Sequence, residues 1–411
     1  MNRILSFFCV SILVFSIFGY PIIAMIAVIL KVDNQNASMA FRSIILLFSL
    51  LVVLFTMSTF LKAKRPCRTY LYLLSVLFFF LFFAIRAAVD SIFSGSGIDA
   101  SVLFVFWVFL IGVTFLPSVA SALGWKFFQE KNLFLCKLGS TVGLFAVVLI
   151  ISVWGYSNGL DTLLGGRIEF DTLNPISIGH VAVSFIIFAY AYYSTSKSAF
   201  FISAPLFYVS VIIAVVLLIS AGSRGPMLSL LMVFLFGVFF NPRIKMIYKI
   251  SAVFLAMSSI VLTVVMYSDL MIVERMTTGL FSDPARIAIF EESKTVFLTD
   301  PVFGAGILSM DTYPHNFVLE SFVVGGLFAG LLFVFINFIS VYAAVRVYRK
   351  GISAVVPLLF IQYFVAGIFS GTIHEASNYW ILLVILLCMS SYNYQSSSGF
   401  YLSHNRVLEK V

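Results

Sequence analysis

The sequence has few charged residues and few cysteines, and each shortage excludes a class of protein. Only 10% of the 411 residues are Asp, Glu, Lys or Arg, whereas soluble domains contain about a quarter. An ordinary soluble protein is therefore excluded. The four cysteines lie in or beside apolar runs without metal-ligand or paired-thiol spacing, so they predict neither a disulfide framework nor a cysteine metal site. P-loop, Rossmann and Gly-x-Ser-x-Gly motifs are also missing.

What the sequence has instead is long apolar runs. Apolar residues make up 62% of the chain and aromatic residues 17%, with 47 phenylalanines. Runs of about 18 residues or more are long enough to cross a bilayer as helices, whereas β-barrels show short alternating segments. We therefore expect an all-α polytopic membrane protein in which one integral domain covers residues 1–411. About twelve spans are predicted, at roughly 4–30, 43–61, 70–89, 101–123, 133–154, 176–193, 200–220, 226–240, 246–267, 316–345, 352–373 and 378–392.

The distribution of charge predicts the orientation of these spans. The net charge is +8, but the basic residues form short clusters between apolar runs, which is typical of membrane topology and not of nucleic-acid binding. If the N-terminus is cytoplasmic, most of the 25 Lys and Arg residues fall inside, as the positive-inside rule requires. Both termini are then cytoplasmic, most acidic residues are outside, and the run from Ile4 is a retained span too long for a signal peptide.

The longest connection between spans is predicted on the outer side, at residues 268–315. Long loops with their own structure usually carry function. Within this loop, Asp283 and Pro284 form a helix-start signal, a cap followed by proline at the first helical position. We expect a helix to about Leu298, ended by the Asp-Pro pair at 300–301. We therefore expect the chemistry of the protein at this large, partly helical outer loop.

The first candidate functional residue is Arg224, in the Gly-Ser-Arg-Gly-Pro motif at 222–226. This motif joins two apolar runs, so the glycine and proline predict a helix break at the outward-facing edge of the bilayer. A guanidinium group at that depth requires an anion, because a lone charge at the bilayer centre costs about 2.5–3.5 kcal/mol. The anion could belong to a substrate, or Arg224 could simply anchor the helix on a lipid phosphate.

Arg286 is the second candidate, in the first turn of the predicted loop helix. A cation there opposes the positive end of the helix dipole unless an anion lies between them. Backbone N–H groups and a guanidinium fork that point to one place would bind a diphosphate well. A solvated ion pair with Asp283, Glu291 or Glu292 is the alternative interpretation.

His315 is the third candidate, in a Tyr-Pro-His-Asn-Phe motif at the start of the tenth predicted span. The helix dipole disfavours imidazolium at that position, and the neutral ring is the form that a general base needs. Asn316 could cap the helix. The alternative is that His315 only marks the membrane interface.

Other polar residues at the same predicted face are weaker candidates. Arg167 and His180 could extend an anion site, although the Asn-Pro pair before His180 is an ordinary helix-start signal and favours a structural role for it. Glu320 lies one turn beyond His315, and the pair His374–Glu375 ends the eleventh span. The outer acids do not form the aspartate pair that holds a divalent ion, so we expect chemistry without a metal or another cofactor.

Taken in order, these motifs resemble one bacterial family, the O-antigen polymerase and O-antigen ligase superfamily. The resemblance rests on Gly-Ser-Arg-Gly-Pro at 222–226, Asp-Pro-Ala-Arg at 283–286, and Pro-His-Asn-Phe-Val-Leu-Glu at 314–320 with glycines at 325–326. The twelve-span plan with both ends inside is also similar to that family.

The resemblance implies a GT-C-like glycosyltransferase of the bacterial inner membrane with a periplasmic active site. It would polymerise undecaprenyl-diphosphate-linked repeat units, which act as both donor and acceptor, in lipopolysaccharide biosynthesis. By analogy, Arg224 and Arg286 would hold the donor diphosphate and His315 would activate the acceptor hydroxyl, with Arg167, His180, Asn316 and Glu320 as further contacts. Candidate protein partners are a chain-length regulator and a flippase of the same pathway.

Three alternatives remain open at this stage. A ligase would transfer the glycan to the lipid A core instead of to another repeat unit; the Asn-Pro pair at 174–175 and the form of the 222–226 motif favour a polymerase. A lipid-linked oligosaccharide flippase would have a similar number of spans, but transporters place charges near the midplane, whereas these candidates gather at one face. If the protein were a structural scaffold, replacing the arginines would cause no loss of glycan product.

Overall fold

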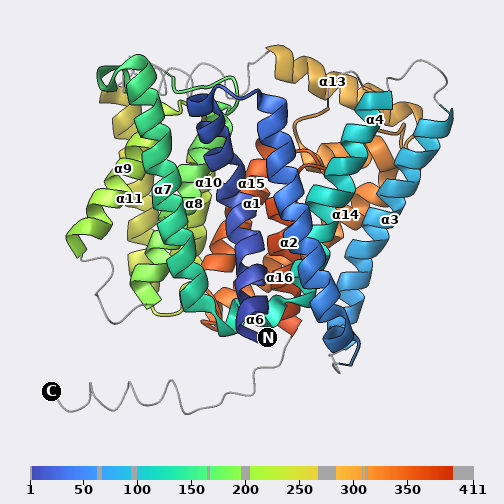
Figure 1. The fold of residues 1–411 in the computed structure, drawn as a ribbon, viewed down its shortest axis with the longest axis horizontal. Coiled ribbons are helices and arrows are strands. Elements are labelled where there is room, and N and C mark those ends of the chain that lie inside the picture. Colours follow the sequence, from blue (N-terminus) through green and yellow to red (C-terminus); the bar gives the residue numbers. More distant parts are fainter. Residues whose placement is uncertain are drawn as a thin grey trace.

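The computed structural model describes residues 2–62, 67–93, 100–163, 167–195, 204–266, 284–307, 309–310 and 313–391 (Figure 1). In these ranges the chain is helical, and the only β-type pairing is an isolated bridge between Phe170 and Leu173. The expected all-α class is confirmed. The elements are α1 Asn2–Leu30, α2 Asn34–Lys62, α3 Cys67–Phe93, α4 Ala100–Trp107, the π-helix η2 Val108–Phe115, α5 Leu116–Leu123, α6 Trp125–Glu130, α7 Asn132–Asn158, the 3₁₀ helix η3 Leu160–Leu163, α8 Pro175–Thr195, α9 Ala204–Ser220, α10 Arg224–Phe240, α11 Met246–Met266, α13 Pro284–Thr299, α14 Phe317–Arg349, α15 Val355–Ser370 and α16 Ser377–Ser391.

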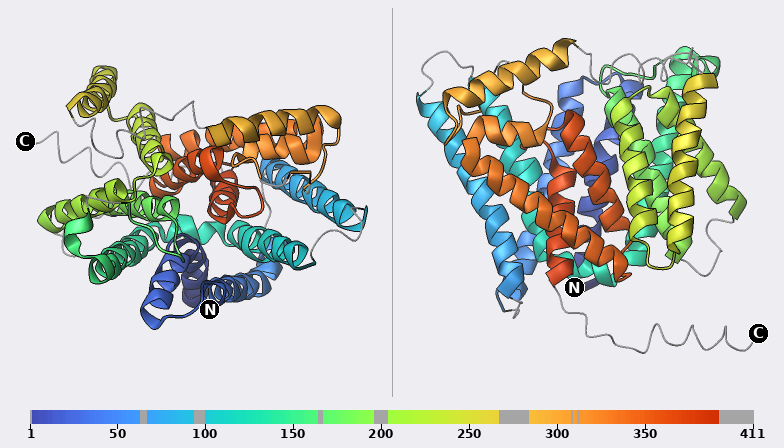
Figure 2. Two further views of the ribbon diagram at one scale, coloured as in Figure 1. Left: turned by 90° about the horizontal axis from the view of Figure 1, so that it is seen from above. Right: turned by 180° about the vertical axis from the view of Figure 1, so that it is seen from behind.

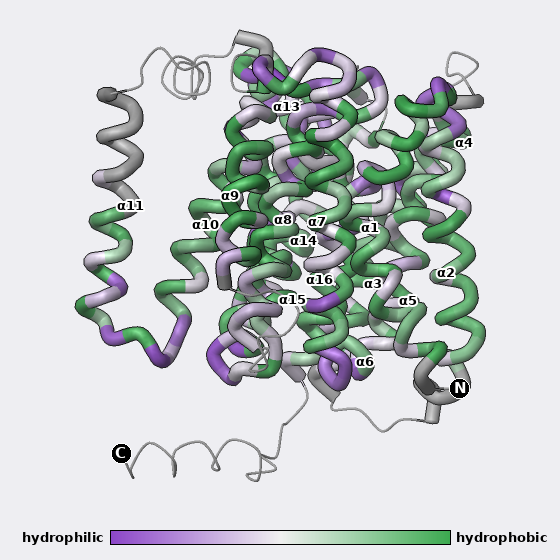
Figure 3. The backbone as a smooth tube through the Cα atoms, turned by 60° about the vertical axis from the view of Figure 1, so that its left-hand side comes forward, coloured by the Kyte–Doolittle hydropathy of each residue, from purple (hydrophilic) through white to green (hydrophobic). Residues whose placement is uncertain are grey.

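The helices have the length and composition of a polytopic membrane protein. Seven described segments are long and apolar enough to cross a bilayer, and five shorter apolar helices accompany them. Figure 3 shows hydrophobic residues along the helices and hydrophilic residues mainly toward the two ends of the bundle. Each predicted span overlaps one helix, except that 101–123 is built from α4, η2 and α5. The membrane class is confirmed, while the count of twelve spans stays a prediction.

Helix α16 lies at the centre of the bundle (Figure 2). It is buried around its circumference, from Tyr379 to Met389, and packs against α1, α3, α5, α14 and α15. A helix that is apolar on every side needs an apolar environment on every side. The last predicted span is therefore the core of the fold, whereas α11 stands at the periphery and packs on α10 (Figure 3).

Helix α14 is broken near its start by Gly326, which has φ 61° and ψ −161°. Only glycine adopts this backbone conformation without strain. The segment that precedes α14, residues 300–307, lies against this break, and we call it the strap. Its carbonyl groups accept from α14, with Leu327 N 2.8 Å from Pro301 O, and Ala305 N donates to Val323 O at 2.9 Å. The strap thus forms hydrogen bonds with backbone N–H and C=O groups of α14 that lack a helical partner at the break.

Helix α13, which belongs to the predicted outer loop, lies across the end of the bundle opposite the N-terminus (Figure 1). It runs from Pro284 to Thr299, as the sequence predicts, and Asp300 then begins a turn in which its carbonyl accepts from Gly304 N. The predicted cap Asp283 is outside the described residues. One face of α13 packs on α14 through Phe297, whose ring is 6.1 Å from that of Phe322.

Replacing Gly326 by Ala should strongly destabilise the protein. An added Cβ would meet the Val302 carbonyl, in addition to a backbone strain of about 1–3 kcal/mol. Gly351→Ala is the matched control, because Gly351 also has a positive φ but has no atom within 4 Å of the added carbon. Thermal unfolding in detergent should show the larger fall in midpoint for Gly326→Ala; equal falls would contradict close packing of the strap.

Candidate functional site

A cavity of about 210 Å³ opens at the end of the bundle that carries α13. Three elements that are distant in sequence enclose it: α13, the start of α14 and the end of α15. Its lining residues are Arg286, Ile289, Phe290, Pro314, His315, Asn316, Leu319, Ile368 and Phe369. The cavity therefore has polar groups from two of the predicted motifs and an apolar wall from α13 and α15.

The strap determines how α13 sits relative to α14. Besides its backbone bonds to the α14 break, it is held from the other side by Asp90 of α3, whose Oδ2 accepts from Ile307 N at 2.7 Å. Asp90 in turn lies 3.3 Å from Arg86. Because both ends of the strap connect to cavity-lining segments, these contacts position Arg286 and His315 around one space.

His315 occupies an unusual backbone conformation for a residue with a side chain. Its φ is 52°, in the left-handed region, which non-glycine residues adopt mainly where the surrounding structure requires it. Its ring lies 4.2 Å from that of Tyr313, centroid to centroid. Burial lowers the pKa of His315, and the nearby positive charge of Arg286 lowers it further. The neutral imidazole expected from the sequence is thus favoured, chiefly by desolvation.

Asn316 caps helix α14. Its side-chain oxygen accepts from the backbone N–H groups of Val318 and Leu319, both at 3.0 Å. This is the capping role that the sequence suggests, and it occupies the oxygen of the side chain. Asn316 lines the cavity, but its main contribution is to begin the helix immediately after His315.

Arg286 lies in the first turn of α13 and its side chain is exposed at the cavity. Within the described part of the chain it forms no ion pair; Glu291, one of its proposed partners, lies instead 3.5 Å from Lys294. The guanidinium charge is therefore available to an anion in the cavity. A cation beside free N–H groups at a helix start is an arrangement that binds phosphate.

Arg224 begins α10 and does not line this cavity. The helix break predicted around it is present, because α9 ends at Ser220 and α10 starts at Arg224, with Gly222 at φ 57° between them. α10 packs along α15, whose last turn does line the cavity. A shared site for Arg224 and Arg286 stays a prediction.

Arg167 lies beside the same helix break. The neighbouring Ile168 donates its N–H to Ser220 O at 2.9 Å, and Arg167 Nη1 is 4.0 Å from Glu169. His180, by contrast, is buried within α8, where the Gln362 side chain donates to its carbonyl at 3.0 Å. This contact ties α8 to α15, as expected for a structural role of His180.

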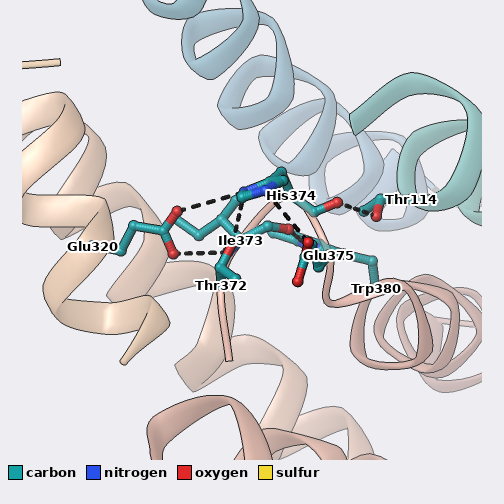
Figure 4. A network of polar contacts seen from close by, with 7 residues as sticks. All are labelled: Thr114, Glu320, Thr372, Ile373, His374, Glu375 and Trp380. Atoms are coloured by element: carbon teal, nitrogen blue, oxygen red, sulfur yellow. Dashed lines mark hydrogen bonds and ion pairs between the residues drawn. The ribbon is translucent and has the colours of Figure 1, made fainter. Parts of the chain in front are cut away.

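Glu320 belongs to a polar network next to the cavity (Figure 4). Its Oε2 accepts from Ile373 N at 2.8 Å, and its Oε1 is 3.9 Å from His374 Nδ1. The same ring nitrogen is 2.6 Å from the Thr372 hydroxyl, and His374 Nε2 is 3.9 Å from Glu375. The network therefore docks the α15–α16 connection on the first turns of α14.

No protein-family model matches this chain, and no curated protein matches it. Among the residues that the structure describes, no group of three or more His, Cys, Asp or Glu side chains is placed to hold a metal ion.

Sequence reasoning missed two residues that organise the site. Tyr313 lies in the predicted motif, but its ring contact with His315 depends on the turn between them. Asp90 gives no sequence signal, because it lies directly after the predicted span 70–89 and its bond to Ile307 joins residues 217 positions apart. Helix η2 was expected as part of a continuous α-helix, yet it is π-helical.

The pKa of His315 should lie below the usual value for histidine, about 6.5, and Arg286→Gln should raise it, because the variant removes a nearby positive charge. The sequence has four histidines, so ¹³C-histidine NMR in detergent can resolve them, with His315→Gln for assignment. Lys294→Gln removes a positive charge from α13 outside the cavity lining and should leave this titration unchanged. An Arg286→Gln titration identical to that of the wild type would contradict the electrostatic contact.

Proposed function

We propose that the protein is a membrane glycosyltransferase that polymerises undecaprenyl-diphosphate-linked repeat units into O-antigen. The observation that carries this proposal is the composition of the cavity. Arg286 and His315 lie at one space whose other wall is made of Ile289, Phe290 and Phe369. An anion-binding group, a neutral base and an apolar surface are what a lipid-linked diphosphate sugar and its acceptor require.

The apolar wall fits the lipid part of such a substrate. It comes from α13 at the end of the bundle and from the last turn of α15. A polyprenyl tail stays in the bilayer because every buried CH₂ group contributes about 0.8 kcal/mol. An enzyme for this substrate must therefore present its polar groups at the edge of the hydrocarbon region, and the combination of polar and apolar residues in the cavity lining supports this proposal.

The polar side fits the chemistry of glycosyl transfer. The acceptor hydroxyl oxygen forms a bond to the anomeric carbon, the bond from that carbon to the diphosphate oxygen breaks, and the diphosphate leaves with the electron pair. Arg286 would stabilise the charge that grows on the diphosphate more strongly in the transition state than in the ground state. His315 would accept the hydroxyl proton, and a single displacement inverts the anomeric configuration.

The remaining predicted residues have supporting roles in this proposal. Arg224 is a second clamp for the diphosphate, and Arg167 lies beside the break that places it. Asn316 holds the helix start behind His315, whereas His180 and Glu320 connect elements that carry the cavity.

We infer a location in the bacterial cytoplasmic membrane, with both termini cytoplasmic and the cavity on the periplasmic side. Two features support this orientation: α13 lies at the end opposite the N-terminus (Figure 1), and the predicted cytoplasmic loops carry most of the basic residues.

Arg286→Ala and Arg224→Ala should each abolish long-chain glycan in cells, because the diphosphate loses a counter-charge as it leaves. His315→Ala should lower turnover by about 10²–10⁴-fold, the usual contribution of a general base, with donor binding retained. Glycan ladders on gels measure the first effect and kinetics of purified enzyme the second. Arg243→Ala, at an exposed position after α10, is the matched control. Normal ladders from a well-inserted Arg286→Ala variant would refute the diphosphate clamp.

Deletion of the gene separates polymerase from ligase. Loss of a polymerase should leave single repeat units on the lipopolysaccharide core, because ligation continues without chain growth. Loss of a ligase should instead leave long chains on the carrier lipid, and loss of a flippase should leave single repeat units on the carrier at the cytoplasmic face. Gel electrophoresis of lipopolysaccharide together with analysis of the carrier-linked glycan identifies which product accumulates.

A further inference from the structure

The network of Glu320, His374 and Glu375 (Figure 4) leads from a buried side chain to a half-exposed one. The Glu320 side chain is 6% exposed and that of His374 18%, whereas that of Glu375 is 46% exposed. One carboxylate therefore anchors the network through the Ile373 N–H, and the other ends it where a solute can reach it. The proposed diphosphate chemistry uses neither Glu375 nor His374.

This network is adjacent to the cavity. Glu320 lies on α14 little more than one turn after His315, and its N–H donates to the carbonyl of the cap residue Asn316 at 2.9 Å. Tyr313 is close to both the cavity and the network. Its ring contacts His315 in the cavity lining, and the charges of the network act on its hydroxyl group. Burial raises the pKa of Tyr313, and the negative charges of Glu375 and Glu320 raise it further.

Aromatic side chains lie next to His374 and His315. Phe106 lies 4.8 Å from the His374 ring and Phe109 lies 6.4 Å from it, centroid to centroid. Tyr313 is 41% exposed, and its ring offers an accessible aromatic surface beside His315. A sugar ring has apolar C–H faces that pack on aromatic rings and hydroxyl groups that donate to carboxylates. Glu375 and Tyr313 offer these two kinds of contact, and they are near enough for the negative charge of Glu375 to raise the pKa of Tyr313.

We propose that Glu375 and Tyr313 form a saccharide subsite that holds one sugar unit of the glycan beside His315. Glu320 and His374 are positioning residues for this subsite: they fix the α15–α16 connection that carries Glu375. This inference rests on the proposed function, because it assigns the sugar-binding part of the same substrate. It places sugar recognition beside the start of α14 and diphosphate recognition on α13.

The test uses a ligand that lacks the diphosphate. Mild acid hydrolysis of the lipid-linked repeat unit releases the free oligosaccharide, and saturation-transfer NMR measures its binding to the full-length protein in detergent. Wild-type protein should bind it, and Glu375→Gln and Tyr313→Leu should each weaken binding at least tenfold. Arg286→Ala should bind normally. Glu291→Gln is the matched control, because this exposed glutamate lies on α13 and pairs with Lys294, outside the network of Glu320, His374 and Glu375.

The positioning role has its own test. Glu320→Gln keeps an oxygen that can accept from Ile373 N and should retain oligosaccharide binding, whereas Glu320→Ala should lose it. Thermal unfolding identifies variants that fail to fold, and Glu375→Gln is expected to fold normally because its side chain is half-exposed.

The outcomes separate this subsite from the proposed polymerase. In the polymerisation reaction, Glu375→Gln should raise KM about tenfold and change kcat little. If wild-type protein does not bind the free oligosaccharide, or if Glu375→Gln and Tyr313→Leu bind it as well as wild type does, the subsite is refuted. If instead Arg286→Ala still makes polymer, the hypothesis of a diphosphate clamp is refuted. The saccharide subsite is then still tested by the binding of the free oligosaccharide in the NMR experiment.

Discussion

The arrangement of the candidate site depends on backbone hydrogen bonds between the strap, residues 300–307, and the break in α14 at Gly326. A broken helix leaves N–H and C=O groups without partners, and in an apolar environment each unpaired group is costly. The strap supplies partners for α14, and Asp90 supplies one for the strap. These hydrogen bonds hold α13 over the start of α14, so that Arg286 and His315 line one cavity.

Within the cavity one charge has two consequences. The positive charge of Arg286 would attract a diphosphate, and it also helps to lower the pKa of His315. A base and an anion clamp are therefore compatible at close range, because the clamp favours the unprotonated base. The helix dipole acts in the same direction at the start of α14. The α15–α16 connection completes this face through Glu320, which receives the Ile373 N–H.

Several parts of the fold and site could be predicted because local chemistry determines them. Long apolar runs become membrane helices wherever they occur in the chain, so the predicted spans coincide closely with helices. The bounds of α13 follow from Pro284 and Asp300, and the capping role of Asn316 follows from its place before an apolar run. Helix-end electrostatics indicates Arg286 and His315 as candidates, and the structure places both at the cavity.

By itself, the sequence determined the membrane class, the helix positions and the residue types able to bind an anion or accept a proton, because these depend on composition and near neighbours. Only the tertiary structure decided that α16 is the central helix, that Arg224 lies outside the cavity lining, and that Glu375 ends a network beginning at Glu320. These features arise from contacts between helices, and apolar runs of similar composition carry no local signal of which helices will be neighbours.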